Sequence, residues 1–299
     1  YVEDREFLGM NRLTLNNNKQ DRSQIRQCIA YSLFSSAGLP APRCNFAQVT
    51  VNGKKLGLFS NVESIKKRFI ARHFNDDDGR LYEGTLSDFS PNWINTFEAK
   101  TNKTDSDRGD LNAVKAALQV PDEELKAALS KVINLDRFIT YWAVEAMINH
   151  GDGYAVNRNN FYIYNDPSTS LLEFIPWGVD QVLKPFVKFG DNLLFVESAL
   201  TRRLYQLPET QQEYVTEVQN QFDMIWSEVE LLREIDRMES LVGAIANDEH
   251  AGDMFFNLAE EVEAVRQFIR TRRTTLEPVI FEPPVFDKAP PVWLCDLEF

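Results

Sequence analysis

Hydrophobic residues recur every three or four positions over most of the second half of the chain. This spacing places apolar side chains on one face of a helix. It predicts helices over residues 191–207, 211–226, 228–246 and 257–275, and a further amphipathic helix over residues 134–149. Two short helices are expected over residues 111–118 and 122–132, where Asp110 and Pro121 mark their starts.

The first part of the chain has a different pattern, with short apolar runs bounded by turn residues. Residues 46–52 and 55–62 flank Asn52-Gly53, a dipeptide that strongly favours a tight hairpin turn. Residues 12–15 predict another strand, and Asp21 or Ser23 can cap the helix that follows. A second helix is expected over residues 65–74.

Two polar stretches are predicted to be loops. Residues 75–80, NDDDGR, lack the glutamate that closes a calcium-binding EF-hand loop, so a solvated acidic turn is expected. Residues 85–110 are expected to be irregular, and the proline-rich tail of residues 282–299 to be extended or disordered.

Candidate chemistry lies between residues 149 and 181. The helix of residues 134–149 should end at His150-Gly151, and a polar loop should follow over residues 152–159. Residues 160–164 and 171–176 then predict a hairpin, with the turn at residues 165–168. Asp152, Asn157 and Asp180 are therefore expected to meet at the open end of this hairpin.

These residue types suit phosphoryl transfer. The reaction needs a carboxylate that orients the attacking hydroxyl, here Asp152, and oxygen ligands for a divalent cation, here Asn157 and Asp180. The alternative is that these side chains only cap helix ends and brace turns, as most loop Asp and Asn residues do. The ordered set around one hairpin favours the metal site.

Five blocks of the sequence resemble the spore coat protein H (CotH) kinase family. They include LTLNN near the start, HGDGYAVNRNNFYIY and IPWGVDQ, and they occupy residues 13–43, 49–70, 81–84, 150–164 and 175–181. Several blocks in order are more specific than any single motif. The resemblance implies a divergent, two-lobed protein kinase-like α+β fold, with a small N-lobe over residues 1–63, a mainly helical C-lobe over residues 64–281 and the tail.

The resemblance also implies roles for individual residues. Asp152 would be the catalytic-loop aspartate, and Asn157 and Asp180 would hold Mg²⁺ or Mn²⁺ beside ATP. Asn160 would brace the loop, as would His150. Glu63 follows the last strand of the first lobe, where it would line the nucleotide site or place a charge at the next helix.

Arg26 stands where a protein kinase carries a helical glutamate. It would contact a phosphate or carboxylate, or else form a surface salt bridge. The implied activity is ATP-dependent phosphorylation of serine or threonine in a coat or surface protein. The alternative is a non-catalytic surface or coat protein with a structural or adhesive role.

One expected feature is not evident. Family members carry, before the LTLNN block, a small-residue-rich loop and a lysine-containing strand that would hold the ATP phosphates. This sequence opens at Tyr1, close to that block. Two interpretations stay open, namely a fragment without its phosphate-binding lysine and a variant with weakened catalysis.

Composition limits the partners and the location. The net charge of −13 argues against nucleic acid and would suit a basic, serine-rich protein substrate, although it also simply favours solubility. Four arginines at 266, 270, 272 and 273 predict a basic helix end, more in keeping with ordinary helix electrostatics than with nucleic-acid binding. No apolar run is long enough for a membrane span. By resemblance, the location is the spore coat, the cell surface or the extracellular space.

The cysteines do not predict a cross-link. Cys28, Cys44 and Cys295 are too few and too scattered for a disulfide framework or a zinc site. Cys28 lies on an apolar helical face and is expected to be a small core residue.

Overall fold

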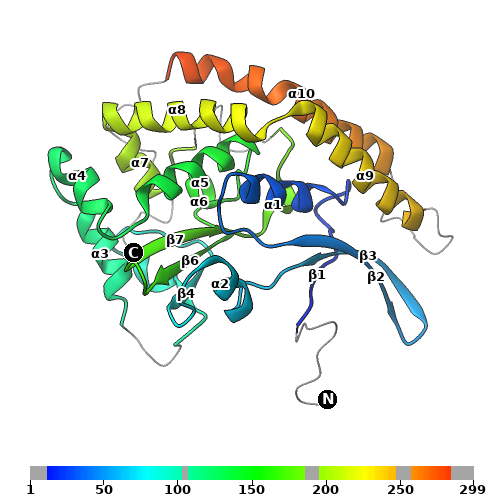
Figure 1. Cartoon of the computed structure of the whole chain (residues 1–299), viewed down its shortest axis with the longest axis horizontal. Coiled ribbons are helices and arrows are strands. Elements are labelled where there is room, and N and C mark those ends of the chain that lie inside the picture. The colour runs from blue at the N-terminus through cyan, green and yellow to red at the C-terminus, as the bar shows by residue number, and fades with distance from the viewer. Residues whose placement is uncertain (1–11, 103–106, 186–194, 247–256, 284–299) are drawn as a thin grey trace.

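The computed structural model describes residues 12–102, 107–185, 195–246 and 257–283. Within them the chain forms two small antiparallel sheets and a larger set of helices (Figure 1). The predicted α+β class is confirmed. The described part of the chain contains no helix that is both long and apolar enough to cross a bilayer.

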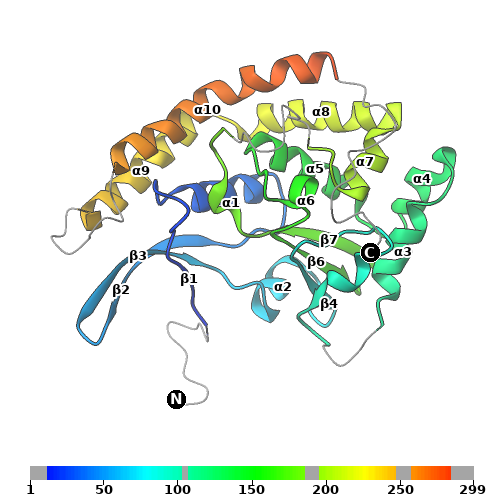
Figure 2. The same ribbon diagram turned by 180° about the vertical axis from the view of Figure 1, so that it is seen from behind.

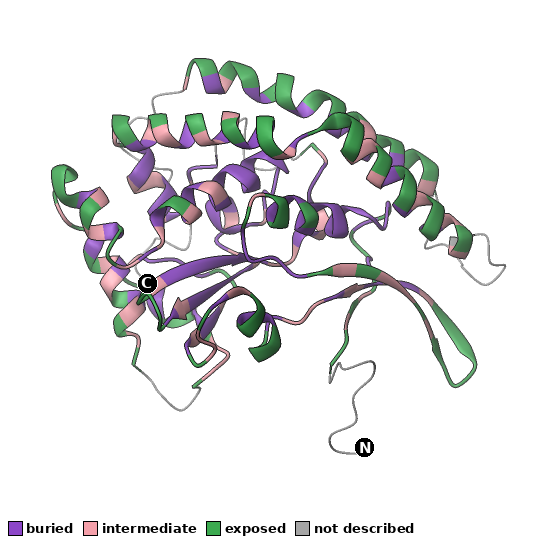
Figure 3. Cartoon of the chain, viewed as in Figure 1, coloured by how far each residue is buried: buried purple, intermediate pink, exposed green. Residues whose placement is uncertain are grey.

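The first sheet has three strands, β1 (Thr14–Asn16), β2 (Cys44–Val51) and β3 (Lys54–Val62), in the order β1-β3-β2. The β2–β3 hairpin turns at Asn52 and Gly53, whose φ angles of 50° and 78° are the positive values that this dipeptide accepts. The predicted hairpin is confirmed. Its far end extends away from the helices and is exposed (Figure 3).

Helix α1 (Arg26–Ser36) connects β1 to β2. The N-cap residue is Ile25, which provides no side-chain cap, but the Oδ2 atom of Asp21 accepts a hydrogen bond from the backbone N–H of Arg26 at 2.8 Å, so Asp21 supplies an acceptor to the helix start from outside the N-cap position. The strand, helix and hairpin thus follow in the order that the sequence predicts.

A disulfide between Cys28 and Cys44 joins α1 to the first residue of β2. The expectation that these cysteines form no cross-link was wrong. They are 16 residues apart in sequence, but the chain returns from α1 into β2 and brings their Cα atoms to 5.1 Å, within the range that a disulfide requires.

The second sheet has the order β5-β4-β6-β7. The hairpin of β6 (Phe161–Asp166) and β7 (Leu171–Pro176) pairs Phe161 with Pro176 at its open end. The predicted hairpin is confirmed. Strand β4 (Arg80–Gly84) pairs with the other side of β6, and β5 (Glu98–Ala99) and β7 are the edge strands.

Residues 85–102 are more ordered than expected. They include the 3-10 helix η1 (Ile94–Thr96) and β5, and the side chains of Phe89, Ile94 and Phe97 are buried. The segment is polar overall and was therefore predicted to be irregular, but its widely spaced aromatic residues pack against the second sheet. Phe97, for example, meets Phe161 edge to face with ring centroids 6.0 Å apart.

Helices make up most of the remaining structure. In chain order they are α2 (Lys67–His73), α3 (Gly109–Ala117), α4 (Asp122–Leu129), α5 (Leu135–Met147), α6 (Tyr154–Asn157), α7 (Ala199–Tyr205), α8 (Pro208–Ile225), α9 (Glu228–Ala246) and α10 (Leu258–Phe281). Each predicted helix has a counterpart with shifted ends; of the helix predicted over residues 191–207, residues 199–205 form α7 and residues 191–194 lie outside the described part of the chain. The short α6 lies inside the segment predicted to be a loop.

The four arginines at 266, 270, 272 and 273 lie within α10, not at its end, because this helix continues to Phe281. Arg266 pairs with Asp236 of α9, Arg270 with Glu263, and Arg273 with Asp223 of α8. The Nε atom of Arg272 donates to the carbonyl of Met147 at 3.0 Å. Arg266, Arg272 and Arg273 therefore connect α10 to α9, α5 and α8, whereas the pair of Arg270 lies within α10.

The main hydrophobic core contains α5, whose residues are nearly all buried, and one face of β6 and β7 (Figure 3). It also includes Ile29 of α1 and Val62 of β3, so it continues across the boundary predicted at residue 63. That boundary stays a prediction. Of the predicted tail, residues 284–299 lie outside the described part of the chain.

Candidate active site

Helix α5 leads into the candidate site. It begins at Leu135, after Asn134, whose side chain accepts a hydrogen bond from the backbone N–H of Arg137. It ends before His150, which is fully buried. Burial lowers the pKa of His150 to about 4, so the imidazole is neutral near pH 7. Because Arg272 donates to the carbonyls of Ala146 and Met147, the end of α5 is fixed from the side of α10.

Asp152 lies just after α5 and is surrounded by asparagine amides. Its Oδ1 atom accepts from Asn157 Nδ2 at 2.5 Å and from Asn159 Nδ2 at 3.3 Å. Asn160 Nδ2 donates both to Oδ2 at 2.7 Å and to the backbone carbonyl of Asp152 at 3.0 Å. The structure therefore brings Asp152 and Asn157 into direct contact, with Asn160 bracing the same carboxylate.

Asp180 comes from the other strand of the hairpin. It lies in the 3-10 helix η2 (Val179–Gln181), immediately after β7 and the turn at Gly178, and α6 and the hairpin lie on the same side of α5 (Figure 2). The N–H of Trp177 donates to the carbonyl of Asn160 at 3.1 Å. A Cβ atom at Gly178 would lie 2.3 Å from Asn160 Oδ1, so glycine allows a close approach here.

Asn160 thus connects the two candidate segments. Its amide nitrogen contacts Asp152, and its amide oxygen lies against Gly178, two residues before Asp180. Asp180 itself accepts a hydrogen bond from Asn16 of β1, with Nδ2 and Oδ2 3.3 Å apart. Asp152 and Asp180 thus both lie beyond the open end of the hairpin, each with its own hydrogen-bond partners.

The environment of Asp180 disfavours an uncompensated charge. Burial raises the pKa of Asp180, while the hydrogen bond from Asn16 opposes this rise. No Lys or Arg within the described residues forms an ion pair with it. A cation at this position would therefore stabilise its carboxylate.

Lys184 follows Asp180 by one turn and was not singled out from the sequence. Its Nζ atom donates to Gln181 Oε1 at 3.4 Å, and it forms no ion pair with any carboxylate in the described ranges. Burial and the nearby charge of Arg26 lower its pKa, against the carboxylates of Asp21 and Asp180. Lys184 thus adds a cation beside Asp180.

Arg26 forms salt bridges, as one of the two alternatives had it, but they are buried and not at the surface. Its Nη1 atom lies 2.7 Å from Asp21 Oδ1, and its Nη2 atom 3.2 Å from Glu261 Oε2 of α10. These two salt bridges tie the start of α1 to α10, and a contact of Arg26 with a phosphate stays a prediction.

Glu63 directly follows β3 and binds two arginines. Its Oε1 atom is 3.0 Å from Arg43 Nη2, and Oε2 contacts Arg72 of α2. Partial burial would raise the pKa of Glu63, but the hydrogen bonds from Arg43 and Arg72 lower it overall. The observed role of Glu63 is thus to join β2 to α2, and a nucleotide contact stays a prediction.

Glu145 is a residue that the sequence did not reveal. It is fully buried on α5, and its carboxylate accepts from the backbone N–H groups of Tyr154 at 3.0 Å and Ala155 at 2.9 Å. The hydroxyl of Tyr141 also donates to it at 2.8 Å. The sequence signal that could have revealed Glu145 is a single acidic residue on the apolar face of a predicted helix. A carboxylate buried at such a position needs hydrogen-bond partners.

Asp88 supports the same loop from the opposite side. Its carboxylate accepts from the Tyr154 hydroxyl at 3.0 Å and from Arg158 Nε at 3.1 Å. Arg158 adopts a positive φ of 55°, and its guanidinium lies 5.3 Å from the ring centroid of Trp93. The segment expected to be an irregular connector therefore holds the far end of α6.

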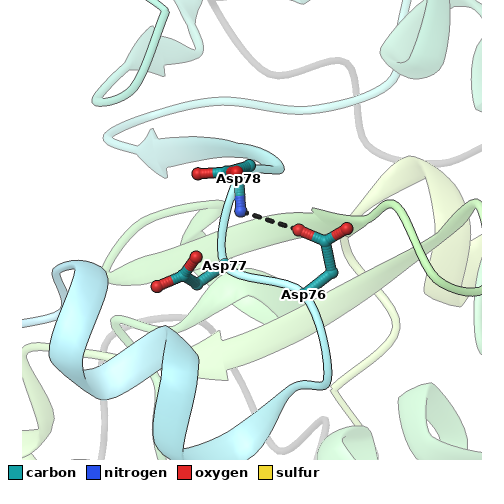
Figure 4. Close-up of side chains that lie close together, drawn as sticks. All are labelled: Asp76, Asp77 and Asp78. Carbon is teal, nitrogen blue, oxygen red and sulfur yellow. Dashed lines mark hydrogen bonds between the residues drawn. The ribbon is translucent and has the colours of Figure 1, made fainter.

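The acidic loop of residues 75–80 brings Asp76, Asp77 and Asp78 together (Figure 4). The N–H of Asp78 donates to Asp76 Oδ1 at 2.9 Å, which is a local turn. Lys67 lies 3.4 Å from Asp77 and 3.1 Å from Asp78. The cluster is thus shaped by a local turn and paired with Lys67 of α2.

A comparison with known families identifies the chain. The sequence model described as CotH kinase protein matches residues 1–276. The chain belongs to the CotH kinase protein family. The resemblance inferred from the five sequence blocks is confirmed.

Two proteins of Bacillus subtilis (strain 168) are similar to parts of this CotH-family chain. Inner spore coat protein H is 24% identical over 192 residues, which are 60% of this chain and 52% of that protein. Inner spore coat protein H-like protein is 33% identical over 61 residues, 20% of each chain. The chain thus spans about half the length of the first relative.

Among solved structures, the Helicobacter pylori proinflammatory kinase CtkA is similar, with a TM-score of 0.38 and 12% sequence identity. The alignment covers 86% of this chain and 85% of that one.

Proposed function

We propose that this protein is an ATP-dependent protein kinase that transfers the γ-phosphate to serine or threonine of a coat or surface protein. The observation that carries the proposal is the position of Asp152, which three asparagine amides hold at the end of the hairpin that also carries Asp180. Membership of a family described as kinase protein supports it.

In this reaction the substrate hydroxyl oxygen forms a bond to the γ-phosphorus as the bond from that phosphorus to the β–γ bridging oxygen breaks. ADP leaves, and the hydroxyl proton passes to Asp152. Asp152 can hold this position because its hydrogen bonds fix the carboxylate before the substrate arrives.

The residues present fit a hard divalent cation. Asn157 uses its amide nitrogen toward Asp152, so its oxygen is left for a metal. Asp180 offers a carboxylate that forms no ion pair with a Lys or Arg among the described residues. Mg²⁺ or Mn²⁺ would neutralise charge on the transferred phosphate, and one carboxylate with one amide oxygen is a sufficient protein contribution because Mg²⁺ keeps several waters.

Lys184 is the better candidate for a direct phosphate contact than Arg26. The guanidinium of Arg26 is already bound to Asp21 and Glu261, whereas within the described part of the chain the Nζ atom of Lys184 has only a 3.4 Å contact with Gln181. We propose that Lys184 binds a nucleotide phosphate, and that Arg26 and Glu63 act by holding α1 and the strands around the nucleotide.

The proposed substrate is a basic, serine-rich protein, because the net charge of −13 favours cationic partners. The proposed location is the spore coat or another extracytoplasmic site. The disulfide between Cys28 and Cys44 supports an oxidising compartment, since cytosolic thiols are kept reduced.

The test is transfer of labelled γ-phosphate from ATP to a basic, serine-rich protein in the presence of Mg²⁺. Asp152→Asn and Asp180→Ala should each abolish labelling. Asp166→Asn is the matched control, because Asp166 lies at the closed end of the same hairpin and its carboxylate accepts hydrogen bonds from the backbone N–H and the hydroxyl of Ser168. Equal labelling by wild type and Asp180→Ala would contradict the mechanism and favour a structural or adhesive role.

A further inference from the structure

Helix α6 begins without a capping side chain of its own. Gly153 precedes it and provides no side-chain hydrogen bond. The first N–H groups of a helix need acceptors, and here the acceptor is Glu145, which reaches across from α5. The two oxygens of Glu145 accept from Tyr154 and Ala155, and these residues lie between Asp152 and Asn157.

The fit between Glu145 and this turn is tight. A Cβ atom on Gly153 would lie 2.2 Å from Glu145 Oε1 and 2.5 Å from the His150 ring. The backbone of Gly153 has φ −89° and ψ −173°, which alanine can also adopt. Glycine is therefore required at this position by the approach of Glu145 and His150, and not by the backbone conformation.

We propose that Glu145 is a positioning residue of the phosphotransfer site. Its carboxylate fixes the first turn of α6 and thereby sets Asp152 relative to Asn157. This inference rests on the proposed function, and it assigns a mechanistic role to a side chain that touches neither substrate nor metal.

Because of its surroundings, Glu145 changes its protonation state near neutral pH, and this change should alter how well it holds the loop. Burial raises its pKa to about 7, against the hydrogen bonds that it accepts. The titratable groups around it are neutral near pH 7, because burial raises the pKa of each tyrosine and lowers that of the histidine. They are Tyr141, Tyr154, Tyr214 and His150. Arg272 of α10 is directed at the carbonyl of Met147.

The ionised carboxylate can accept at both oxygens, whereas a protonated carboxyl has one oxygen occupied by a proton. Wild-type kcat should therefore increase as the pH rises through about 7. In Glu145→Gln the shape is kept, but an amide NH₂ replaces one acceptor and opposes a backbone N–H. This pH-dependent limb should be absent from the variant.

The experiment compares wild type with Glu145→Gln, Tyr141→Phe and the matched control Glu173→Gln. Glu173 is also a buried glutamate, but it binds Asn134 and Arg137, away from α6. We expect Glu145→Gln to lower kcat about 10- to 100-fold, with the KM for ATP little changed. Tyr141→Phe should have a smaller effect, and Glu173→Gln should leave kcat unchanged.

Hydrogen–deuterium exchange of the peptide covering residues 152–157 gives a readout that needs no transfer. It should become faster in Glu145→Gln and stay unchanged in Glu173→Gln. If wild type transfers no phosphate, the proposed function fails, but the exchange still tests whether Glu145 holds the loop. Unchanged exchange, or faster exchange with unchanged kcat in an active enzyme, would overturn the positioning role.

Gly153→Ala keeps the inference falsifiable if Glu145→Gln does not fold. The added methyl group would displace Glu145 from the opposite side while leaving its charge in place. We expect the same loss of kcat and the same faster exchange. Wild-type kinetics and exchange in a folded Gly153→Ala protein would overturn the proposal.

Discussion

Asp152 and Asp180, the two carboxylates of the proposed site, are held in different ways. Asp152 accepts side-chain hydrogen bonds from three asparagines that follow it within eight residues, and Glu145 and Asp88 brace the same loop. Asp180 accepts one longer bond of 3.3 Å, from Asn16 in the first sheet. The proposed proton acceptor is thus preorganised locally, whereas the position of the proposed metal ligand depends on how the first sheet and α1 lie against η2.

The largest expected effect is the pH dependence of the free energy of unfolding that arises from Glu145, which braces the loop of Asp152. Because the folded-state pKa of Glu145 is raised from 4.5 to about 7, its protonated form favours folding at low pH, and this stability is lost as the pH rises through about 7. Such a shift corresponds to about 3 kcal/mol. Urea unfolding at a series of pH values should show that the free energy of unfolding of wild type, relative to that of Glu145→Gln, falls by this amount as the pH rises. A pH-independent difference would contradict the prediction.

The disulfide in the region of α1 and the first sheet, which positions Asp180, is expected to contribute nearly as much to the free energy of unfolding. Cys28→Ser opens the 16-residue link between α1 and β2 and should lower the free energy of unfolding by about 3 kcal/mol. Urea unfolding with and without reductant measures it. Reductant should destabilise wild type and leave Cys28→Ser unchanged. Insensitivity of wild type to reductant would show that the cross-link does not form.

Asn160→Ala should disturb the Asp152 side more than any other single amide. It removes the bonds of 2.7 and 3.0 Å to Asp152 and the contact with Gly178. We expect kcat to fall about 10- to 100-fold, as for other residues that orient a reacting group. Steady-state kinetics of phosphate transfer would measure it. Asn165→Ala, at the far end of β6, is the control, and equal activities of the two variants would contradict the prediction.

Asn16→Ala should have the smallest effect, because it removes a single long hydrogen bond to Asp180. A loss of about two- to tenfold in apparent Mg²⁺ affinity is expected, with kcat nearly unchanged at saturating metal. Titration of transfer against Mg²⁺ would measure it, with Asn45→Ala, two strands away, as control. A larger loss than for Asn160→Ala would reverse the comparison between the two carboxylates.

Local pattern was sufficient to predict much of the fold. Asn52-Gly53 predicts its hairpin because few residues accept the two positive φ angles of the turn. The apolar stripe of residues 134–149 predicts α5, and the runs around residues 165–168 predict β6 and β7. The contact of Asp152 with Asn157 could also be predicted from the sequence, because both residues lie in one short segment next to a helix end.

Tertiary structure alone decided the contacts between distant segments. Cys28 meets Cys44 because the chain doubles back from α1, and Arg26 is buried because α10 brings Glu261 to it. Glu145 became visible as a support of the Asp152 loop only when α5 and α6 were placed together. The physical reason is that spacing along the chain fixes which face a side chain occupies, whereas its partners depend on which elements pack against that face.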